Sequence, residues 1–337
     1  MISLQGRMGF ELKSLDIAPA VLEAKQVRMK MLACGVCGTD LHLLRQAGEF
    51  SPLGHEVCAR VLETGSEARR FTPGQQVVIE DNTLCGICDD CKSGRTDLCL
   101  SGFTMQGQSG MAEELVLHEN QLHLAEGLDP IKAAMTEPLS VAIRCVETLA
   151  PPPGSSLLIF GMGAIGLFCA AYARIRGVGQ IVMAAQTPGS QRNRAAETIA
   201  KDYGIDRFVY TSTSDWKEAV LSIGAYSSVI VAAPPAMCVQ ALEIVGYGGK
   251  VLACGVTFGE GNMANLDVNE MVFRKKSLLT SIAEPAMYFP LSLQLIRSGQ
   301  IDVVRAVTHT LKLSEAFKLK DLYGNDSPAV KTVIIPG

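Results

Sequence analysis

The chain has 337 residues, of which 48% are hydrophobic and 19% are charged, and its net charge is −4 at pH 7. This composition is typical of a packed globular protein and excludes a disordered one, while the length favours two domains over one. A negative net charge gives no support for nucleic-acid binding, which needs a basic surface. The charged N-terminal stretch lacks the apolar segment of a signal peptide, so we expect a cytoplasmic protein.

The first part of the chain, residues 20–145, predicts a small irregular β-domain. Short strand-like runs are separated there by glycine and proline turns, and the clearest runs are QVRMKMLA, QQVVIED and AEELVLH. Apolar residues alternate with polar ones in the first of these runs, which is typical of a half-buried strand.

The pattern changes after the proline run at 151–153. Apolar strand-like runs then alternate with helix-like segments, in the order SLLIF, GAIGLFCAAYARIRG, QIVMAA, RNRAAETIAKDYG, SVIVAA, AMCVQALEIV and GKVLACGV. This alternation predicts a parallel sheet covered on both faces, which is a doubly wound α/β domain. The tail has a helix-like PLSLQLIRSGQ and a final strand, AVKTVIIPG, which we expect to complete the first domain. The expected domains are residues 1–147, residues 148–283, and a return segment at 284–337.

One uncharged stretch, residues 148–173, is long enough to span a bilayer. The PPPG segment at 151–154 would break a helix at one end, and glycines follow at 161, 163 and 166. A buried strand, a tight turn and a buried helix explain the stretch better, so we expect no membrane association.

Four cysteines, Cys85, Cys88, Cys91 and Cys99, lie within the segment CGICDDCKSGRTDLC. The two-residue gaps let successive thiolates turn toward one point, and a longer loop returns the fourth. Four thiolates saturate a tetrahedral Zn²⁺, so this lobe, residues 85–99, predicts a structural zinc site. Free or disulfide-paired cysteines are disfavoured in a chain with no export signal, and a ferredoxin-like cluster is the other metal alternative.

Candidate ligands for a second metal ion lie at three places. Cys37 follows a strand-like run, His55 and Glu56 lie in PLGHEVCARV, and Glu137 precedes a helix in TEPLSV. A catalytic zinc needs about three protein ligands and an open position for water or substrate. Singly, a histidine before a strand or a glutamate before a proline is more often structural, so the hypothesis depends on the whole set.

The stretch FGMGAIG has the G-x-G-x-x-G pattern at Gly161, Gly163 and Gly166, after an apolar strand and at the start of a helix. In this context the first glycine makes the tight turn and the second lets the backbone approach a pyrophosphate. The third allows close packing of helix on strand, and the helix N-terminus faces the phosphates. The stretch therefore predicts a dinucleotide-binding site.

The next strand, QIVMAA, lacks the acid that would bind the ribose 2′-OH of NAD. That position is Ala185, followed by Gln186, and the loop after it carries Ser190, Arg192 and Arg194. Because a missing acid removes repulsion and an arginine can bind a 2′-phosphate, the pattern favours NADP over NAD. A solvated helix start is the alternative explanation of the arginines.

By position alone, the loops after later strands, at Ala232 and Gly255, are expected next to the nicotinamide. The expected cofactor-binding residues are Gly161, Gly163, Ala164, Ile165, Gly166, Ala185, Gln186, Ser190, Arg192, Arg194, Ala232 and Gly255.

Taken together, these motifs resemble those of the zinc-dependent medium-chain alcohol dehydrogenase family. The segments CGVCGTDLH, GHE, the cysteine spacing of 85–99, EPLSVA and GMGAIG occur in the order of that family. Because EPLSV carries a glutamate rather than a cysteine, the chain resembles the sorbitol and threonine dehydrogenase branch of the family. The resemblance spans residues 10–337 and implies an α/β protein with a GroES-like β catalytic domain and a Rossmann cofactor domain.

The resemblance also implies a ligand set for the catalytic zinc. Cys37 and His55 would hold the ion, with Glu56 and Glu137 as the remaining carboxylate ligands. The resemblance leaves open which glutamate is the resting ligand. Cys34, in the same CGVC segment, would be a buried bystander.

Three further residues of CGVCGTDLH receive catalytic roles from the resemblance. Thr39 would accept the proton of the substrate hydroxyl, and His42 would pass it to solvent, helped by a pKa near neutrality. Asp40 would accept a hydrogen bond from the His55 ring and fix its tautomer. A surface histidine and a turn aspartate are the alternative readings of His42 and Asp40.

We therefore expect a zinc-dependent oxidoreductase that transfers a hydride between NADP or NAD and a secondary alcohol or ketone. A glutamate ligand in place of a second thiolate favours polyols, sugars, cyclitols or amino alcohols as substrates. We expect two zinc ions per chain, one catalytic and one structural, and a homodimer or homotetramer. The alternatives are a non-catalytic zinc- and nucleotide-binding sensor and a zinc-free reductase on the same fold.

Overall fold

The computed structural model describes residues 2–16, 21–257, 261–324 and 328–337. The chain forms two compact units. The first consists of Met1–Ser140, Ala283–Gly324 and Lys331–Gly337, and the second of Val141–Ile282 and Asn325–Val330. The domain limits expected from the sequence stay a prediction.

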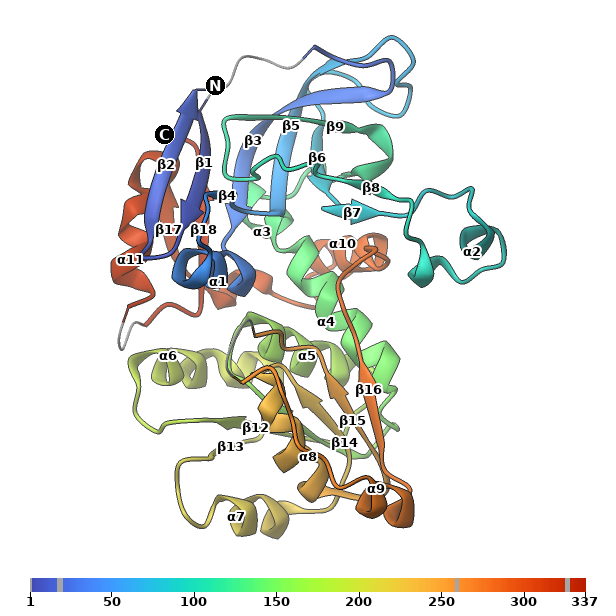
Figure 1. Ribbon diagram of the computed structural model, residues 1–337, viewed down its shortest axis with the longest axis vertical. Coiled ribbons are helices and arrows are strands. Elements are labelled where there is room, and N and C mark those ends of the chain that lie inside the picture. Colours follow the sequence, from blue (N-terminus) through green and yellow to red (C-terminus); the bar gives the residue numbers. More distant parts are fainter. Residues whose placement is uncertain (1, 17–20, 258–260, 325–327) are drawn as a thin grey trace. The chain divides into compact units, whose positions relative to one another are not determined.

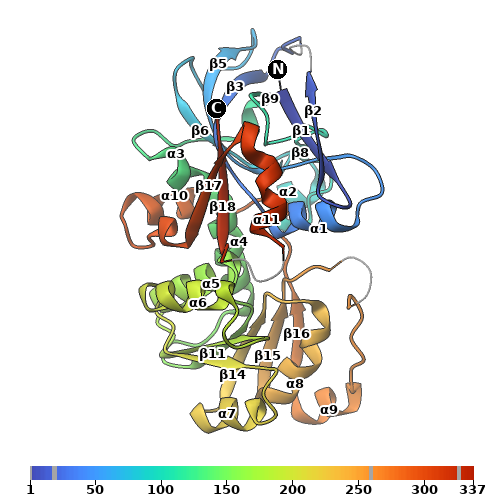
Figure 2. The ribbon, with the colours of Figure 1, turned by 90° about the vertical axis from the view of Figure 1, so that its left-hand side faces the viewer.

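The first unit is built around a seven-stranded sheet with the strand order β10-β6-β5-β3-β18-β17, in which β9 also pairs with β3. Its strands are β3 (Gln26–Gly35), β5 (Glu56–Thr64), β6 (Gln76–Ile79), β9 (Glu114–His118), β10 (Leu122–Leu124), β17 (Val307–Lys312) and β18 (Lys331–Ile335). The C-terminal strand β18 runs antiparallel to β3, and Figure 2 shows β17 and β18 in this unit.

Alternation in β3 explains how this sheet builds a core. Val27, Met29 and Met31 are each no more than 1% exposed, whereas Lys30 between them is exposed. One face of the strand is therefore apolar and buried, as the period of two predicts.

Smaller elements complete the first unit. A three-stranded sheet contains β1 (Ile2–Arg7), β2 (Glu11–Asp16) and β4 (Ser51–Pro52), and a separate pair contains β7 (Asn82–Thr83) and β8 (Phe103–Thr104). The helices are α1 (Gly38–Gln46), α2 (Asp89–Lys92), α3 (Pro130–Ala134), α10 (Phe289–Arg297) and α11 (Leu319–Leu322). Figure 1 shows α2 in a lobe that projects beyond β7 and β8.

The second unit is a six-stranded parallel sheet with the order β13-β12-β11-β14-β15-β16. Its strands are β11 (Ser156–Phe160), β12 (Gln180–Ala185), β13 (Arg207–Tyr210), β14 (Tyr226–Val231), β15 (Val245–Ala253) and β16 (Ser277–Thr280). Its helices are α5 (Ala164–Ile175), α6 (Gln191–Ala200), α7 (Trp216–Ile223), α8 (Cys238–Ile244) and α9 (Val268–Arg274), and α4 (Thr136–Leu149) enters it from the first unit.

Helices cover both faces of the parallel sheet. Figures 1 and 2 show α5 and α6 on one face and α7 and α8 on the other. The strand order reverses between β11 and β14, so the loops after these two strands diverge at one edge. In open parallel sheets, ligands bind at this switch point.

Among the residues that the structure describes, no helix combines the length and the apolar character needed to cross a membrane.

Candidate metal centres and cofactor site

Cys37 is fixed by the first turn of α1. It is the N-cap of that helix, and its Sγ accepts a hydrogen bond from the backbone N–H of Thr39 at 3.5 Å. The backbone N–H of Cys37 in turn donates to Asp40 Oδ2 at 2.9 Å. The bond to Asp40, together with acceptance of the Asp40 backbone N–H by the Cys37 side chain, forms a capping box, which satisfies helix N–H groups and sets the direction of the thiol.

Asp40 connects this turn to the segment that carries His55. Its second oxygen, Oδ1, accepts a hydrogen bond from the backbone N–H of Gly54 at 2.8 Å, and the residue is 2% exposed. We had expected Asp40 to accept from the His55 ring. Its two oxygens accept from backbone groups, so it positions the segments of Cys37 and His55, and Asp40 also raises the pKa of the His55 ring. The bond from the His55 ring to Asp40 stays a prediction.

Cys37, His55 and Glu56 are close enough to share a metal ion. One ligand atom from each lies within 4.8 Å of the others. Glu56 is 1% exposed, and its Oε2 has no hydrogen-bond partner among the described residues. A buried carboxylate oxygen without a partner is costly, and a bound cation would remove this cost. The residues present therefore fit a zinc ion.

The sequence analysis missed Lys331, the first residue of β18. Its Nζ donates to Glu56 Oε1 and, at 2.9 Å, to the carbonyl oxygen of Val36. Burial opposes its charge, but the Glu56 carboxylate and the Cys37 thiol raise the pKa of Lys331 overall. A lone lysine in the apolar run AVKTVIIPG was the signal that could have identified it.

Glu137 is a buried acid in the first turn of α4, outside the three-residue group. The pKa of Glu137 is raised to about 8, mainly by burial. The His55 ring opposes this rise, whereas the carboxylates of Glu56 and Asp81 add to it. Burial disfavours the charged form of His55, yet Cys37, Asp40 and Glu137 together raise the pKa of its ring. Glu137 therefore lies within electrostatic reach of the metal-site residues.

Thr39 and His42 lie three residues apart on α1, so they share one face of the helix. The thiol of Cys37 donates to Thr39 Oγ1 at 3.7 Å, which places this hydroxyl beside the metal-site sulfur. His42 is half-buried. These positions suit a path for a proton from the metal site along the helix surface.

The four cysteines of the lobe also converge. Their Sγ atoms all lie within 4.8 Å of one another, with 4.0 Å between Cys85 and Cys91 and 3.9 Å between Cys88 and Cys99. These separations are close to those of thiolates around one tetrahedral zinc and too long for disulfides, and all four residues are free thiols.

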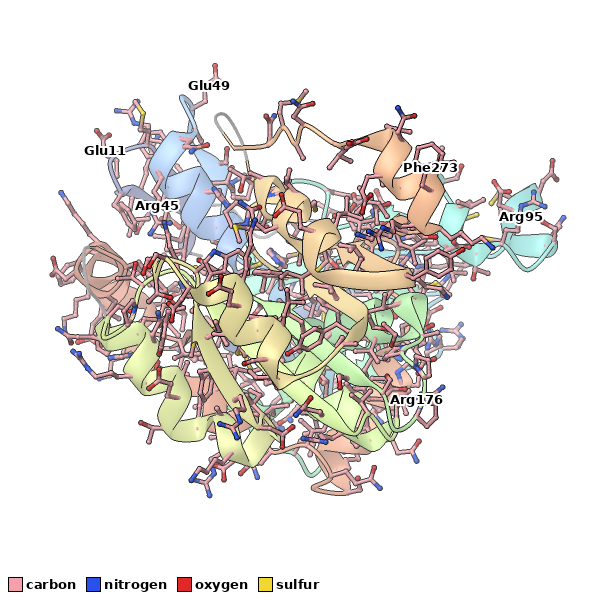
Figure 3. All side chains as sticks on the ribbon, turned by 90° about the horizontal axis from the view of Figure 1, so that it is seen from below. Glu11, Arg45, Glu49, Arg95, Arg176 and Phe273 are labelled. Atoms are coloured by element: carbon pink, nitrogen blue, oxygen red, sulfur yellow. The ribbon has the colours of Figure 1, made fainter. Side chains whose placement is uncertain are left out.

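Backbone groups favour the thiolate of Cys85 in this lobe, whereas burial and the neighbouring cysteines raise the pKa of the Cys91 thiol to about 12. The N–H groups of Ile87 and Cys88 donate to Cys85 Sγ and lower the pKa of this thiol to about 6. Neither α2 nor the short helical turn at Thr96–Leu98 buries any residue, so the lobe has no apolar core of its own. Arg95, which is labelled in Figure 3, pairs with Asp90 at 2.7 Å on the exposed side of the lobe.

In the second unit, the structure explains why each glycine of the G-x-G-x-x-G stretch stands at its position. Gly161 has φ +112°, and a Cβ there would lie 2.4 Å from the carbonyl oxygen of Ala232. A Cβ on Gly166 would lie 2.0 Å from the oxygen of Gly161. Gly163 caps α5, which begins with Ala164 and Ile165. The turn thus brings backbone N–H groups to a helix N-terminus, as phosphate binding requires.

The loop between β12 and α6 contains the other expected cofactor residues. Ala185 ends β12, Gln186 follows, and Ser190 caps α6 by accepting from the N–H of Asn193 at 3.2 Å. Gly255 lies after β15, where a Cβ would be 2.0 Å from the oxygen of Ala233.

The two arginines of this loop differ in position. The Nη2 atom of Arg192 lies 3.1 Å from the point where a Cβ on Gly163 would be, so its guanidinium reaches the phosphate-binding turn. Arg194 instead donates through Nη1 to the carbonyl oxygen of Gly189 in its own loop. Arg192 is therefore the better placed of the two to meet a phosphate.

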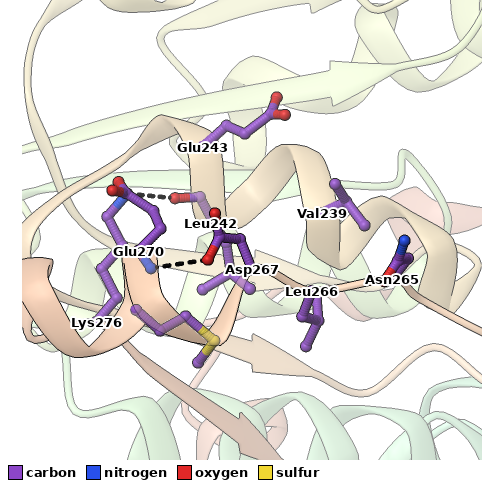
Figure 4. A pocket seen from close by; sticks show the side chains of 9 residues that line it. Val239, Leu242, Glu243, Asn265, Leu266, Asp267, Glu270 and Lys276 are labelled. Carbon is purple, nitrogen blue, oxygen red and sulfur yellow. Dashed lines mark hydrogen bonds and ion pairs between the residues drawn. The ribbon is translucent and has the colours of Figure 1, made fainter.

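A pocket of about 440 Å³ in the second unit lies apart from these residues (Figure 4). It is lined by α8, α9 and the segment between them, and none of the expected cofactor residues contributes to it. Lys276 in its wall donates to the oxygen of Leu242 at 2.7 Å and to Glu270 at 3.2 Å. Its charge is satisfied within the protein, so the pocket offers no free cation to an anionic ligand.

The fold and these residue groups define a two-unit, metal-dependent dinucleotide enzyme, and comparison with known proteins agrees. Residues 23–127 match the family described as alcohol dehydrogenase GroES-like domain, and residues 164–298 match zinc-binding dehydrogenase. L-galactonate-5-dehydrogenase of Escherichia coli is 34% identical to the chain over 83% of each sequence. L-idonate 5-dehydrogenase of Vitis vinifera is 29% identical, over 93% of this chain and 90% of its own.

A solved structure gives the same result at the level of the fold. A putative zinc-binding dehydrogenase from Sinorhizobium meliloti, described as bound to NADP, has a TM-score of 0.84 and 27% identity, over 99% of each chain. The chain belongs to the zinc-binding alcohol dehydrogenases and is an oxidoreductase. The predicted family, the GroES-like and Rossmann fold and the enzyme class are confirmed, and the non-catalytic alternative is not favoured.

Proposed function

We propose that the enzyme transfers a hydride between NADP and a secondary alcohol group of a polyol, sugar, cyclitol or amino alcohol, and that it also reduces the corresponding ketone. The observation that carries this proposal is the buried, unpartnered Oε2 of Glu56 beside Cys37 and His55. Two relatives, the L-galactonate and the L-idonate dehydrogenase, are named for polyhydroxylated substrates, which supports a substrate of this kind.

Cys37 and His55, with Glu56 or Glu137, would hold the catalytic zinc. When bound, zinc acts as a Lewis acid on the substrate oxygen. The hydroxyl of Thr39 accepts the substrate proton, and His42 passes it to solvent. A bound nicotinamide would supply the redox chemistry, because its C4 would accept the hydride of the alcohol carbon with its electron pair.

In this proposal, Lys331 positions the carboxylate of Glu56. Its ammonium holds Glu56 Oε1, which leaves Oε2 as the oxygen available to a metal. Asp40 keeps the turns of Cys37 and His55 at a fixed separation through Cys37 N and Gly54 N. Such supporting contacts typically change metal affinity or activity by about 10- to 100-fold.

We assign a second, structural zinc to Cys85, Cys88, Cys91 and Cys99. The converging thiols and the absence of buried residues in α2 support this assignment. Four protein ligands leave no position for substrate, so this zinc stabilises the lobe and takes no part in the reaction.

NADP is the proposed cofactor because Ala185 stands where an acid would select NAD. The guanidinium of Arg192 beside Gly163 and the hydroxyl of Ser190 are placed to meet phosphate oxygens. In this proposal residues 148–283 bind the dinucleotide, while residues 1–147 and 284–337 carry the metal sites. We also propose a homodimer or homotetramer, which light scattering of the purified protein would measure.

One assay tests the proposal as a whole. Purified enzyme is mixed with NADP or NAD and a panel of alditols, cyclitols and amino alcohols, before and after treatment with a zinc chelator, and absorbance at the NADPH band is followed. We expect turnover with NADP at a higher kcat/KM than with NAD, abolished by the chelator and restored by Zn²⁺. Full turnover in zinc-free protein would overturn the mechanism, and equal kcat/KM values for both dinucleotides would overturn the NADP assignment.

A further inference from the structure

A glycine at the end of β3, Gly35, lies directly opposite a candidate metal ligand. It pairs with Glu56, the first residue of β5, in the antiparallel ladder of the two strands. Gly35 is buried, and its φ lies outside the left-handed region that favours glycine. The backbone therefore does not require glycine here, so the reason for it must lie in the space around the residue.

Two side-chain ends fill the space over Gly35. A Cβ on this residue would lie 1.8 Å from Oε2 and 2.9 Å from Cδ of Glu56, and 2.9 Å from Cε of Met135. No backbone atom is among these nearest neighbours. Gly166 differs, because a Cβ there would meet the carbonyl oxygen of Gly161. The missing side chain of Gly35 thus makes room for a carboxylate rather than for the close approach of two backbone segments.

The carboxylate oxygen over Gly35 is the one that has no hydrogen-bond partner. Oε2 of Glu56 is buried and without a partner among the described residues, whereas Oε1 accepts from Lys331 Nζ. The same ammonium donates to the carbonyl oxygen of Val36, the residue after Gly35, at 2.9 Å. The carboxylate is therefore held on one side by the buried cation and placed on the other by the space over Gly35.

The two side chains over Gly35 differ in their freedom to move. A methionine end such as that of Met135 has three rotatable bonds and adapts to an added methyl group at low cost. The Glu56 carboxylate is tied to a buried ammonium, so its displacement changes where its free oxygen lies. An alanine at position 35 should therefore fold, because only side-chain ends must shift, and its main effect should fall on Glu56.

We propose that Gly35 is a positioning residue of the catalytic metal site, and that the absence of its side chain places the Glu56 carboxylate where it can meet zinc. Gly35 touches neither substrate nor cofactor in this proposal and acts only through Glu56. Residues that orient a ligand in this way set metal affinity without binding the metal themselves. The inference rests on the proposed function and adds a residue to the support of its metal site.

Zinc affinity tests the inference without turnover. A chelator is titrated into the zinc-loaded protein, and the release step that is missing in Cys37→Ser is assigned to this site. We expect Gly35→Ala to lower the affinity in this step by about 10- to 100-fold and to leave the step of the four-cysteine lobe unchanged. Gly48→Ala is the matched control, because Gly48 is exposed and a Cβ there would meet nothing within 4 Å.

A second background shows whether Gly35 acts through Glu56. Glu56→Gln keeps the size of the side chain and removes the charge that binds a metal. Added to this variant, Gly35→Ala should lower zinc affinity by less than about threefold, because two residues that act through one contact are not additive. Loading with Co²⁺ gives a spectroscopic readout, since its visible absorption depends on ligands and geometry. The spectrum of this site should change in Gly35→Ala and stay unchanged in Gly48→Ala.

The outcomes separate this inference from the proposed function. Circular dichroism checks that each variant folds. The inference is overturned if Gly35→Ala binds zinc at least as tightly as the wild type, loses the same affinity in both backgrounds, or fails to fold, and the proposed function then still stands. A wild type without the release step that Cys37→Ser lacks would overturn the proposed catalytic zinc, and this inference with it.

Discussion

At the scale of single residues, CGVCGTDLH contains two cysteines with unlike surroundings. Cys37 lies at a helix N-terminus with its sulfur beside His55 and Glu56. Cys34 is fully buried, and a Cβ on Gly54 would lie only 2.6 Å from its sulfur. Burial raises the pKa of the Cys34 thiol, so it stays protonated and is a poor metal ligand. The segment is therefore not a paired C-x-x-C unit.

The first prediction follows from this contrast. Cys37→Ser should remove one zinc per chain and reduce kcat at least 1,000-fold, because the site loses its thiolate. Cys34→Ser should keep both zinc ions and lose about 1–3 kcal/mol of unfolding free energy, since it buries a hydroxyl. Zinc analysis by mass spectrometry, steady-state kinetics and urea unfolding measure these effects. Retention of zinc and activity in Cys37→Ser would contradict the ligand assignment.

Lys331 gives the second prediction. In excess chelator, Lys331→Met should lower the free energy of unfolding by about 3–5 kcal/mol, because it leaves the Glu56 carboxylate buried without its cation. The double variant with Glu56→Gln should recover part of this loss. Urea unfolding measures both, and Lys30→Met, an exposed lysine on β3, serves as the control. A Lys331→Met variant as stable as the wild type would show that the Lys331–Glu56 ion pair contributes nothing to stability.

At the scale of elements, the sequence predicts most of the architecture because each strand type has its own pattern. Apolar runs such as SLLIF become β11, a strand buried on both faces, and the glycine stretch becomes the turn into α5. Contacts between distant elements have no such local pattern. Lys331 reaches Glu56 because β18 pairs with β3, and Asn82 reaches Glu284 across the first unit. Asp40 likewise contacts Gly54 only after folding.

The loop between β12 and α6 gives the third prediction. Arg192→Ala should raise the Kd for NADPH by about 10- to 100-fold, because it removes a charged hydrogen-bond donor beside the phosphate-binding turn. The Kd for NADH should rise less, since NADH lacks the 2′-phosphate. Arg194→Ala is the matched control, because Arg194 is engaged with the oxygen of Gly189. Fluorescence titration measures the Kd of NADPH and of NADH for each variant and for the wild type. An equal loss of affinity for both dinucleotides in Arg192→Ala would show that Arg192 meets the pyrophosphate instead.

At the scale of the whole molecule, the second unit and the four-cysteine lobe are stabilised in different ways. The sheet of the second unit is held by an apolar core that includes Phe160, Val229 and Val251, each no more than 1% exposed. The four-cysteine lobe has no such core, and Ile87 and Leu100 in and beside it are 74% and 98% exposed. A segment of this size cannot order itself by burial, so we expect its fold to depend on the proposed structural zinc.

The last prediction tests this dependence. Cys88→Ser should lose one zinc per chain and unfold the lobe, which exposes the peptide bonds after Lys92 and Arg95 to trypsin. Cleavage there should be at least 10-fold faster than in wild type, while the Kd for NADPH should stay unchanged because the proposed dinucleotide site belongs to the other unit. Cys37→Ser, which should lose the other zinc, is the matched control and should resist trypsin in the lobe. Cleavage of both variants at one rate would mean that the two metal sites are not independent, and a lobe that resists trypsin in Cys88→Ser would refute its dependence on zinc.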